Sequence, residues 1–192
     1  MKKILIGTHN KGKFKEISYL ISKKIKKISP ENLKIKSPKE TGKTFAANAK
    51  LKVNYFSRFT NLPVISDDSG LFVEALGNLP GVSTARYAGE NASDQENIEK
   101  MLKNLSNEEN RKAFFKTVIY FFDGETSLDT EGTLNGQITT TSRGNNGFGY
   151  DPIFEIDGST LAELSFEEKT DISHRKIAAK KMCDLLTDTF EE

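Results

Sequence analysis

The stretch Ile65-Ser66-Asp67-Asp68-Ser69-Gly70 tells more about the fold than any other part of the sequence. With the preceding apolar run, Leu62-Pro63-Val64-Ile65, it predicts a buried strand over residues 63–66 that ends in two adjacent carboxylates. Like charges side by side repel, and a divalent cation between them would relieve the repulsion. Carboxylates are hard oxygen ligands, which favour Mg²⁺. The alternative is an ordinary surface turn, because Asp, Ser and Gly are all common in turns.

Outward from this strand, strand and helix patterns alternate along the chain. Strands are expected at residues 3–7, 63–66, 113–122 and 127–136, with helices from residue 13, over 44–58, from Ser93 and from Ser173. Ser93 and Glu96 form a capping-box pattern. The residues expected to face inward from the helices are Phe14, Ile17, Leu20, Ile21, Phe45, Ala49, Val53, Phe56, Ile98, Met101, Leu102, Leu105, Ile177, Ala178, Met182 and Leu185. This alternation predicts an α/β fold with a mixed sheet.

The overall composition is that of a soluble globular protein. The chain has 192 residues, of which 29% are charged and 36% hydrophobic, so we expect one domain over residues 1–192. Residues 1–7 are too short in their apolar part for a signal peptide, and no apolar run approaches the length of a membrane span. Cys183 is the only cysteine, which favours a reducing compartment. We therefore expect a cytoplasmic protein without a membrane partner.

Positive charge is concentrated near the start of the chain. The net charge is +1, but residues 1–52 carry 15 lysines against three glutamates, a net of +12. Such a region can attract polyanions, either nucleotide phosphates or nucleic acid. For Lys23, Lys24, Lys26 and Lys27, a solvated helix end or loop is the better interpretation.

The segment Thr8-His9-Asn10-Lys11-Gly12-Lys13 lies between the first strand and the first helix, with residues 8–12 expected as a loop. Backbone N–H groups and the helix dipole favour an anion at such a position, and Lys13 can add a full charge. The alternative interpretation makes Asn10 a helix cap and Lys13 a surface lysine.

A second unusual loop is Gly144-Asn145-Asn146-Gly147-Phe148-Gly149-Tyr150-Asp151-Pro152. Its glycines permit close approach of a ligand, Phe148 or Tyr150 could stack on a base, and Asp151 could accept hydrogen bonds from a base edge. The alternative is a loop anchored to the core by its aromatic rings. Further along, Ser173-His174-Arg175 places donors at a helix start.

Taken together, these pieces resemble the inosine triphosphate pyrophosphatase family, the Ham1-like nucleoside triphosphate pyrophosphatases. The matches follow the family's order over nearly the whole chain. They are Thr8 to Lys13 with Glu16; Glu40-Thr41-Gly42 with Thr44-Phe45 and Asn48-Ala49; Ser66 to Leu71; Pro80-Gly81 with Ser83 to Tyr87 and Gly89; Gly147 to Phe154; and Ala162-Glu163-Leu164, Glu168-Lys169 and Ser173-His174-Arg175. Two departures are His9, where the family usually has a small residue such as glycine, and Ala47, where a glutamate often precedes the asparagine.

The resemblance implies a Maf/Ham1-like fold, in which a long central mixed sheet is flanked by helices and the active site lies in a cleft between two lobes. It implies an enzyme that hydrolyses ITP, dITP and XTP to the nucleoside monophosphate and diphosphate, which removes them from the nucleotide pool. It also implies a homodimer and no stable complex with nucleic acid. The alternatives are a Maf-like pyrophosphatase for modified pyrimidine nucleotides and a non-enzymatic nucleotide or nucleic-acid binder.

Carried over position by position, the resemblance implies that Asp68 is the general base and that Glu40 and Asp68 hold Mg²⁺, with support from Asp67. Arg175 is expected to donate to the 6-keto oxygen of the base, where an adenine amino group would bring two donors together. The residues implied to bind substrate are Thr8, His9, Asn10, Lys11, Gly12, Lys13, Ser69, Phe148, Gly149, Tyr150, Asp151, Lys169, His174 and Arg175.

Overall fold

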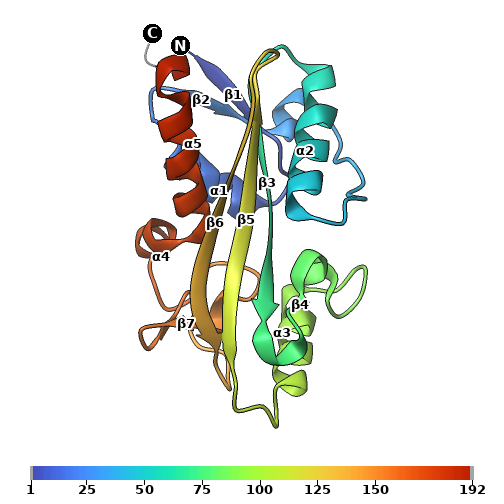
Figure 1. Cartoon of the computed structure of the whole chain (residues 1–192), viewed down its shortest axis with the longest axis vertical. Coiled ribbons are helices and arrows are strands. Elements are labelled where there is room, and N and C mark those ends of the chain that lie inside the picture. Colours follow the sequence, from blue (N-terminus) through green and yellow to red (C-terminus); the bar gives the residue numbers. More distant parts are fainter. Residues whose placement is uncertain (1, 191–192) are drawn as a thin grey trace. The chain divides into compact units, whose positions relative to one another are not determined.

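A computed structural model describes residues 2–190 of the chain. Its strands form one sheet in the order β2-β1-β3-β5-β6-β7-β8, with β4 paired to β3 (Figure 1). Parallel pairs (β1 with β2 and with β3) and antiparallel pairs (β3 with β4, β6 with β7, β7 with β8) both occur, which confirms a mixed sheet. The strands are β1 (Lys3–Ile6), β2 (Lys26–Ile28), β3 (Val64–Val73), β4 (Leu79–Pro80), β5 (Lys112–Phe122), β6 (Ser127–Ile138), β7 (Phe154–Ile156) and β8 (Ser159–Thr160).

Side-chain caps mark the starts of most helices. Thr44 accepts a hydrogen bond from the Ala47 amide at the start of α2, and Ser93 and Glu96 form the expected capping box at the start of α3. The α-helices are α1 (Lys11–Leu20), α2 (Phe45–Phe56), α3 (Asp94–Asn104), α4 (Phe166–Ile172) and α5 (His174–Phe190). Short 3₁₀ turns lie at Pro30–Leu33, Ser57–Phe59, Glu74–Leu76, Gly81–Arg86 and Asp151–Ile153.

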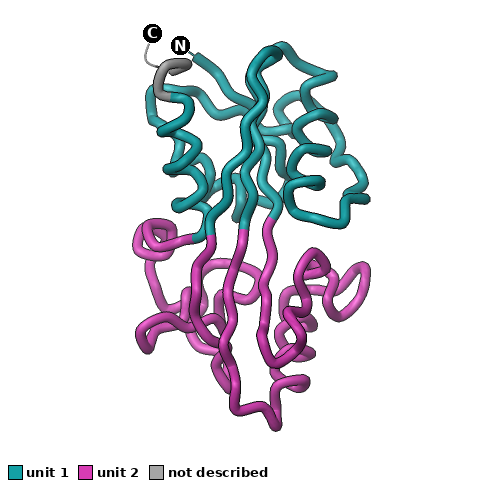
Figure 2. Tube along the Cα trace, viewed as in Figure 1, with its two compact units in different colours: residues 1–68, 117–132, 174–192 teal, residues 69–116, 133–173 magenta. Residues whose placement is uncertain are grey.

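The chain divides into two compact units (Figure 2). Unit 1 comprises residues 1–68, 117–132 and 174–192, and unit 2 comprises residues 69–116 and 133–173. Strands β3, β5 and β6 each contribute residues to both units.

Unit 1 has three layers. On one face of its strands, Ile17 of α1 and Ala178 and Met182 of α5 pack with Ile4 and Ile6. On the other face, α2 contributes Ala49, Val53 and Phe56, which pack against Leu5, Val64 and Tyr120. The alternation of Ile4, Leu5 and Ile6 between the two clusters follows from the period of two along a strand. Figure 1 shows α5 and α2 on opposite sides of these strands.

Unit 2 is built around one apolar cluster. Leu71 and Val73 of β3 and Phe115 of β5 contribute to it, and α3 covers it with Ile98 and Met101. Tyr150 and Ile153, which precede β7, and Phe154, its first residue, also belong to the cluster.

Four expectations about local structure need correction. The strand expected over residues 63–66 continues to Val73, because Leu71 and Val73 also reach a core, so Asp67 and Asp68 lie inside β3 rather than at its end. Helix α1 begins at Lys11, two residues earlier than expected. Lys26 and Lys27 lie in the edge strand β2. In α5, Ile177 and Leu185 are exposed, and Ala179 and Leu186 take the inward positions beside Ala178 and Met182.

Candidate active site

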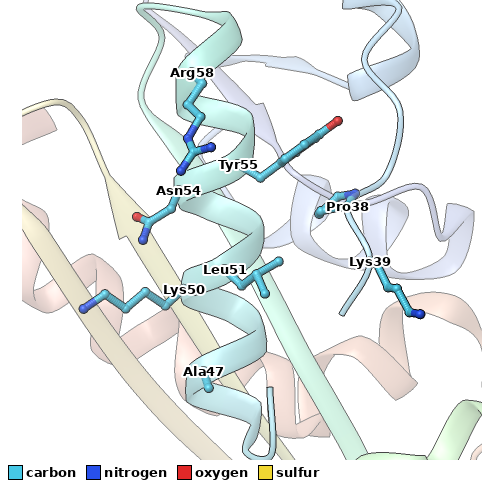
Figure 3. Close-up of a pocket in the computed structure, with 8 residues that line it drawn as sticks. All are labelled: Pro38, Lys39, Ala47, Lys50, Leu51, Asn54, Tyr55 and Arg58. Atoms are coloured by element: carbon cyan, nitrogen blue, oxygen red, sulfur yellow. The ribbon is translucent and has the colours of Figure 1, made fainter. Parts of the chain in front are cut away.

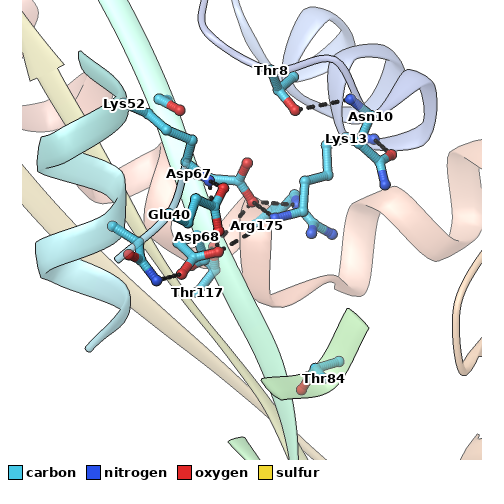
Figure 4. A network of polar contacts seen from close by, with 12 residues as sticks. Thr8, Asn10, Lys13, Glu40, Lys52, Asp67, Asp68, Thr84, Thr117 and Arg175 are labelled. Atoms are coloured by element: carbon cyan, nitrogen blue, oxygen red, sulfur yellow. Dashed lines mark hydrogen bonds and ion pairs between the residues drawn. The ribbon is translucent and has the colours of Figure 1, made fainter. Parts of the chain in front are cut away.

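Asp67 and Asp68 are buried side by side on β3, in unit 1. Neighbouring residues of a strand point to opposite faces of the sheet. Accordingly, Asp67 contacts residues of α1 and α5, while the shortest contacts of Asp68 are to residues of α2 (Figure 4). Lys13 of α1 reaches both carboxylates, since its ammonium also lies 3.9 Å from Asp68 Oδ1. Thr117 of β5 donates to the carbonyl oxygen of Asp68 at 3.1 Å, which ties the backbone of β3 at this point to the neighbouring strand.

The fully buried Asp67 carboxylate lies in an ion-pair network in which Lys13 is partly exposed. Arg175 donates from Nε to Asp67 Oδ2 at 3.0 Å and from Nη1 to Glu16 Oε2 at 2.8 Å. The ammonium of Lys13 lies 3.4 Å from Asp67 Oδ2. Buried carboxylates are tolerated when cations pair with them in this way, so Lys13 is not the surface lysine of the alternative interpretation.

The Asp68 carboxylate is held from the opposite side. Asn48 donates to Asp68 Oδ2 at 3.0 Å, and its own side-chain oxygen accepts from the Gly42 amide at 2.7 Å. The ammonium of Lys52 lies 3.6 Å from Asp68 Oδ1 and donates to Glu40 Oε1 at 2.8 Å. Asn48 and Lys52 are one turn apart on α2, which places both at the acidic centre.

The two carboxyl groups have opposite pKa shifts. Burial alone would raise the pKa of Asp67, but the charges of Lys13, Arg175 and Lys52 outweigh it and hold that pKa well below its ordinary range. Burial raises the pKa of Asp68, and the negative charge of Glu40 adds to this, while Lys13 and Lys52 oppose it only in part. A pair of carboxyl groups with separated pKa values is a common sign of distinct roles in acid–base chemistry.

Glu40 and Asp68 suit a hard cation such as Mg²⁺. The Lys52 ammonium forms ion pairs with both carboxylates, so the two lie close enough for one cation to contact both. The Oδ1 atom of Asp67 is buried and accepts no hydrogen bond within the described residues. No group of three His, Cys, Asp or Glu side chains in residues 2–190 is arranged as a ready-made metal site. Mg²⁺ commonly takes one or two carboxylates and completes its shell with water and substrate phosphates.

The loop before α1 supplies polar groups close to this centre. Asn10 caps α1 by accepting a hydrogen bond from the Lys13 amide at 2.9 Å. This confirms the alternative interpretation of the sequence, in which Asn10 is a helix cap. Lys11, Gly12 and Lys13 form the first helical turn rather than loop. Thr8 is buried, and its hydroxyl accepts from the Asn10 amide at 3.2 Å.

Arg175 and His174 begin α5 and are both buried. Gly132 of β6 makes this position possible, because a Cβ atom there would clash with the backbone carbonyl of His174. The structure thus brings together in unit 1 the following predicted site residues: Thr8, His9, Asn10, Lys11, Gly12, Lys13, Glu40, Asp67, Asp68, His174 and Arg175.

The other predicted site residues belong to unit 2: Ser69, Phe148, Gly149, Tyr150, Asp151 and Lys169. The buried Lys169 ammonium pairs with Asp151 and lies 4.4 Å from the centre of the Phe148 ring. Asp151 also accepts from the Phe148 amide at 2.8 Å, and Asp94 accepts from the Gly149 amide at 2.7 Å. Phe148 is half-buried, whereas the Tyr150 ring belongs to the apolar core, so Phe148 is the better placed of the two for stacking.

Four residues at the acidic centre were given no role on the basis of sequence. Glu16 and Asn48 stand in the matched motifs, but their motif positions do not reveal what they contact. Lys52 could have been found from the sequence, because helical spacing places it on the same face as Ala49, Val53 and Phe56, which were expected to point inward. Thr117 lies in a strand of mostly apolar residues and gave no such signal.

An open pocket of about 620 Å³ lies elsewhere on unit 1, beside α2 (Figure 3). It is lined by Pro38, Lys39, Ala47, Lys50, Leu51, Asn54, Tyr55 and Arg58. Its cationic side chains do not converge, because Lys39 and Lys50 point in different directions in Figure 3. None of its lining residues belongs to the predicted site.

The mixed sheet and the charge-balanced acidic centre define an α/β protein suited to handling phosphate groups. A model of the Ham1 family matches residues 4–185, and the chain belongs to that family. The dITP/XTP pyrophosphatase of Salmonella paratyphi A is 43% identical over 194 residues, which cover 97% of this chain and 98% of the relative. The dITP/XTP pyrophosphatase of Caldanaerobacter subterraneus subsp. tengcongensis is 44% identical over 199 residues, covering 100% of both chains.

Solved structures give the same assignment. A HAM1 protein from Coxiella burnetii matches with a TM-score of 0.87 at 38% identity, and the Ham1 protein of Staphylococcus aureus with 0.86 at 40%. Each comparison covers 98% of this chain and 100% of the other. Across residues 2–190, no helix has both the length and the apolar character needed to cross a membrane.

Proposed function

We propose that this protein hydrolyses non-standard purine nucleoside triphosphates, of the dITP and XTP type, to the nucleoside monophosphate and diphosphate. Membership of the Ham1 family and relatives named dITP/XTP pyrophosphatase support the reaction. The observation that carries the proposal most directly is the pair of adjacent, buried carboxyl groups on β3, whose pKa values are shifted apart.

In this proposal, Asp68 is the general base. Its raised pKa gives its carboxylate a higher proton affinity than an exposed aspartate, which suits proton abstraction from water. The water oxygen attacks the α-phosphorus, the bond to the bridging oxygen breaks, and diphosphate leaves with that oxygen. Lys13 is suited to balance the negative charge that develops on the phosphates, and Asp67 keeps Lys13 in position.

Glu40 and Asp68 would hold Mg²⁺, with Asp67 in support. When bound, the ion would reduce the negative charge on the phosphate oxygens. Base recognition is assigned to Phe148, which would stack, and to Asp151 and Lys169, whose pairing fixes the loop that carries the ring.

Several further assignments stay proposals. Arg175 is proposed to donate to the 6-keto oxygen, and its bonds to Asp67 and Glu16 give it a second, structural role. A cleft between two lobes and a homodimer rest on the family resemblance, and a cytoplasmic location rests on the single cysteine and the composition of the sequence. Light scattering of the purified protein would decide between monomer and dimer.

The test is a diphosphate-release screen over purine and pyrimidine triphosphates, with and without Mg²⁺. We expect ITP, dITP and XTP to react far faster than ATP, GTP and CTP, and only when the metal is present. Chromatography should give IMP and diphosphate from ITP as the first products. If IDP and orthophosphate appear first, the attack occurs at the γ-phosphorus and the proposed mechanism is wrong.

A further inference from the structure

We propose that His9 is a positioning residue. It ties residues 8–13, the proposed phosphate-binding segment that comprises the loop before α1 and the first turn of that helix, to the segment at residues 35–40 that leads into Glu40. The inference rests on the proposed function, because the roles of the loop and of Glu40 come from it. Its structural part concerns contacts within unit 1 and can be tested without substrate.

Both ring nitrogens of His9 are engaged across a sequence separation of more than 25 residues. Nε2 lies 3.0 Å from the carbonyl oxygen of Ile35, and Nδ1 lies 2.6 Å from the hydroxyl of Ser37. A carbonyl oxygen can only accept, so Nε2 carries the proton, and in the neutral ring Nδ1 accepts from Ser37. The ring also lies beside Phe56, with a distance of 6.2 Å between ring centres. His9 therefore makes a two-point clamp on one short segment.

The clamped segment has few other restraints. Residues 36–41 form no helix or strand. Within the described part of the chain, their only hydrogen bonds are those of Ser37 to His9 and of Lys52 to Glu40. Pro38 and Lys39 line the open pocket beside α2, so that side of the segment has little packing. Ile35 anchors one end in the core and Gly42, bonded to Asn48, anchors the other.

The clamp joins two parts of the acidic centre that must be in place together. The loop leads directly into the first turn of α1, which carries Lys13, the partner of Asp67. The clamped segment carries Glu40, which shares Lys52 with Asp68. Holding the two parts together before ligands arrive reduces the ordering cost of binding. If the clamped form becomes less populated, apparent affinity for metal and substrate falls in proportion, while the rate at saturation changes little.

Four variants separate the possible contributions of His9. His9→Ala removes the ring, and His9→Phe keeps a ring beside Phe56 but has no hydrogen-bonding groups. His9→Gln has a side-chain amide that can donate to Ile35. Ser37→Ala removes the second contact while leaving the loop unchanged, and it serves if His9→Ala does not fold. Ser57→Ala is the matched control, because its hydroxyl bonds only locally, to the carbonyl oxygen of Asn54.

The first measurement is limited proteolysis of the metal-free, substrate-free protein with trypsin, followed by mass spectrometry. Cleavage after Lys36 and Lys39 should accelerate about two- to tenfold in His9→Ala and His9→Phe, since each lost hydrogen bond lowers the cost of local opening. His9→Gln should lie closer to the wild type, and Ser57→Ala should match it. Unchanged cleavage in His9→Ala, or a rate in His9→Gln as high as in His9→Phe, overturns the clamp.

The second measurement is the Mg²⁺ concentration for half-maximal diphosphate release from ITP, together with KM and kcat. In His9→Ala, the half-maximal Mg²⁺ concentration and the KM for ITP should each rise about two- to tenfold. The kcat at saturation should stay within about twofold of the wild type. The double variant of His9→Ala and Ser37→Ala should be no worse than His9→Ala alone. A lower kcat with unchanged half-saturation values would overturn the positioning role. If the wild type releases no diphosphate, the proposed function fails, and the proteolysis result still decides the clamp.

Discussion

At the scale of single residues, the clearest feature is that two neighbouring aspartates have different environments. Asp67 is surrounded by Lys13, Arg175 and Thr117, whereas Asp68 has a weaker set of partners and the nearby charge of Glu40. The difference arises because neighbouring positions of a strand face opposite layers of the protein. One carboxylate is thereby kept ionised, while the other keeps a higher proton affinity.

Asp68→Asn should fold normally and lose most of its activity. The amide is nearly the same size, but it neither accepts a proton from water nor binds Mg²⁺ well. Loss of a general base typically lowers the rate by about 10²- to 10⁴-fold. Diphosphate release from ITP measures this, with the exposed Asp129→Asn as control. Near-normal turnover by a folded Asp68→Asn protein would contradict the assignment of Asp68 as the general base.

Arg175→Ala should lower stability strongly, because it leaves Asp67 and Glu16 as buried carboxylates without their main cation. Removal of one partner of a buried ion pair typically costs about 3–5 kcal/mol. Urea unfolding measures the loss, and the exposed Arg58→Ala should change stability by no more than about 0.5 kcal/mol. The same protein tests base readout: an ITP/ATP ratio of kcat/KM equal to that of the wild type would leave Arg175 a structural role only.

The lowered pKa of Asp67 predicts a pH dependence of stability. A carboxyl group whose folded-state pKa lies below its ordinary value of 3.8 stabilises the folded state above that pH, and this contribution is lost as the pH falls toward the folded-state pKa. Between pH 5 and pH 3, wild type should therefore lose more unfolding free energy than Asp67→Asn. Urea titrations at both pH values measure the difference. Equal losses in the two proteins would contradict the assigned shift.

At the scale of helices and strands, local sequence signals were reliable wherever the decisive interaction is local. The capping box of α3, the cap of α2 and the central strand β5 were all predictable from short-range pattern. The extent of β3 was not, because Asp67 and Asp68 resemble a turn until Lys13, Lys52 and Arg175 are known to neutralise them. Those partners come from three distant segments of the chain, and no local pattern reveals them.

Ser93→Ala should destabilise the protein by about 1 kcal/mol, because the Ser93 hydroxyl accepts from the Glu96 amide at the start of α3. The nearby Ser106→Ala is the matched control, since Ser106 follows the end of the same helix and only its backbone amide, which the substitution keeps, bonds to the last turn. Thermal unfolding of both variants gives the comparison. Equal effects of the two substitutions would mean that the cap contributes nothing measurable.

At the scale of the whole molecule, three strands connect the two units covalently. Strands β3, β5 and β6 pass from one unit to the other within their length, so neither unit can lose its strands without affecting the other. We expect this continuity to make unfolding cooperative, although each unit has its own apolar core.

Phe56→Ala and Phe154→Ala test this cooperativity, since the first residue lies in a core of unit 1 and the second in the core of unit 2. Each should cost about 3–5 kcal/mol, the usual range for a buried phenylalanine. In calorimetry, both variants should show one transition at a lower temperature. A second transition in either variant would mean that the units unfold separately.

The arrangement of unit 1 also has a consequence for synthesis on the ribosome. Ile4 and Ile6 of β1 share a cluster with Ala178 and Met182 of α5, which are translated long after them. Residues 69–116 and 133–173, which make up unit 2, have all been translated before α5 emerges. On this face β1 can therefore pack against Ile17 of α1 soon after synthesis, but it lacks the cover of α5 until all of unit 2 has been translated.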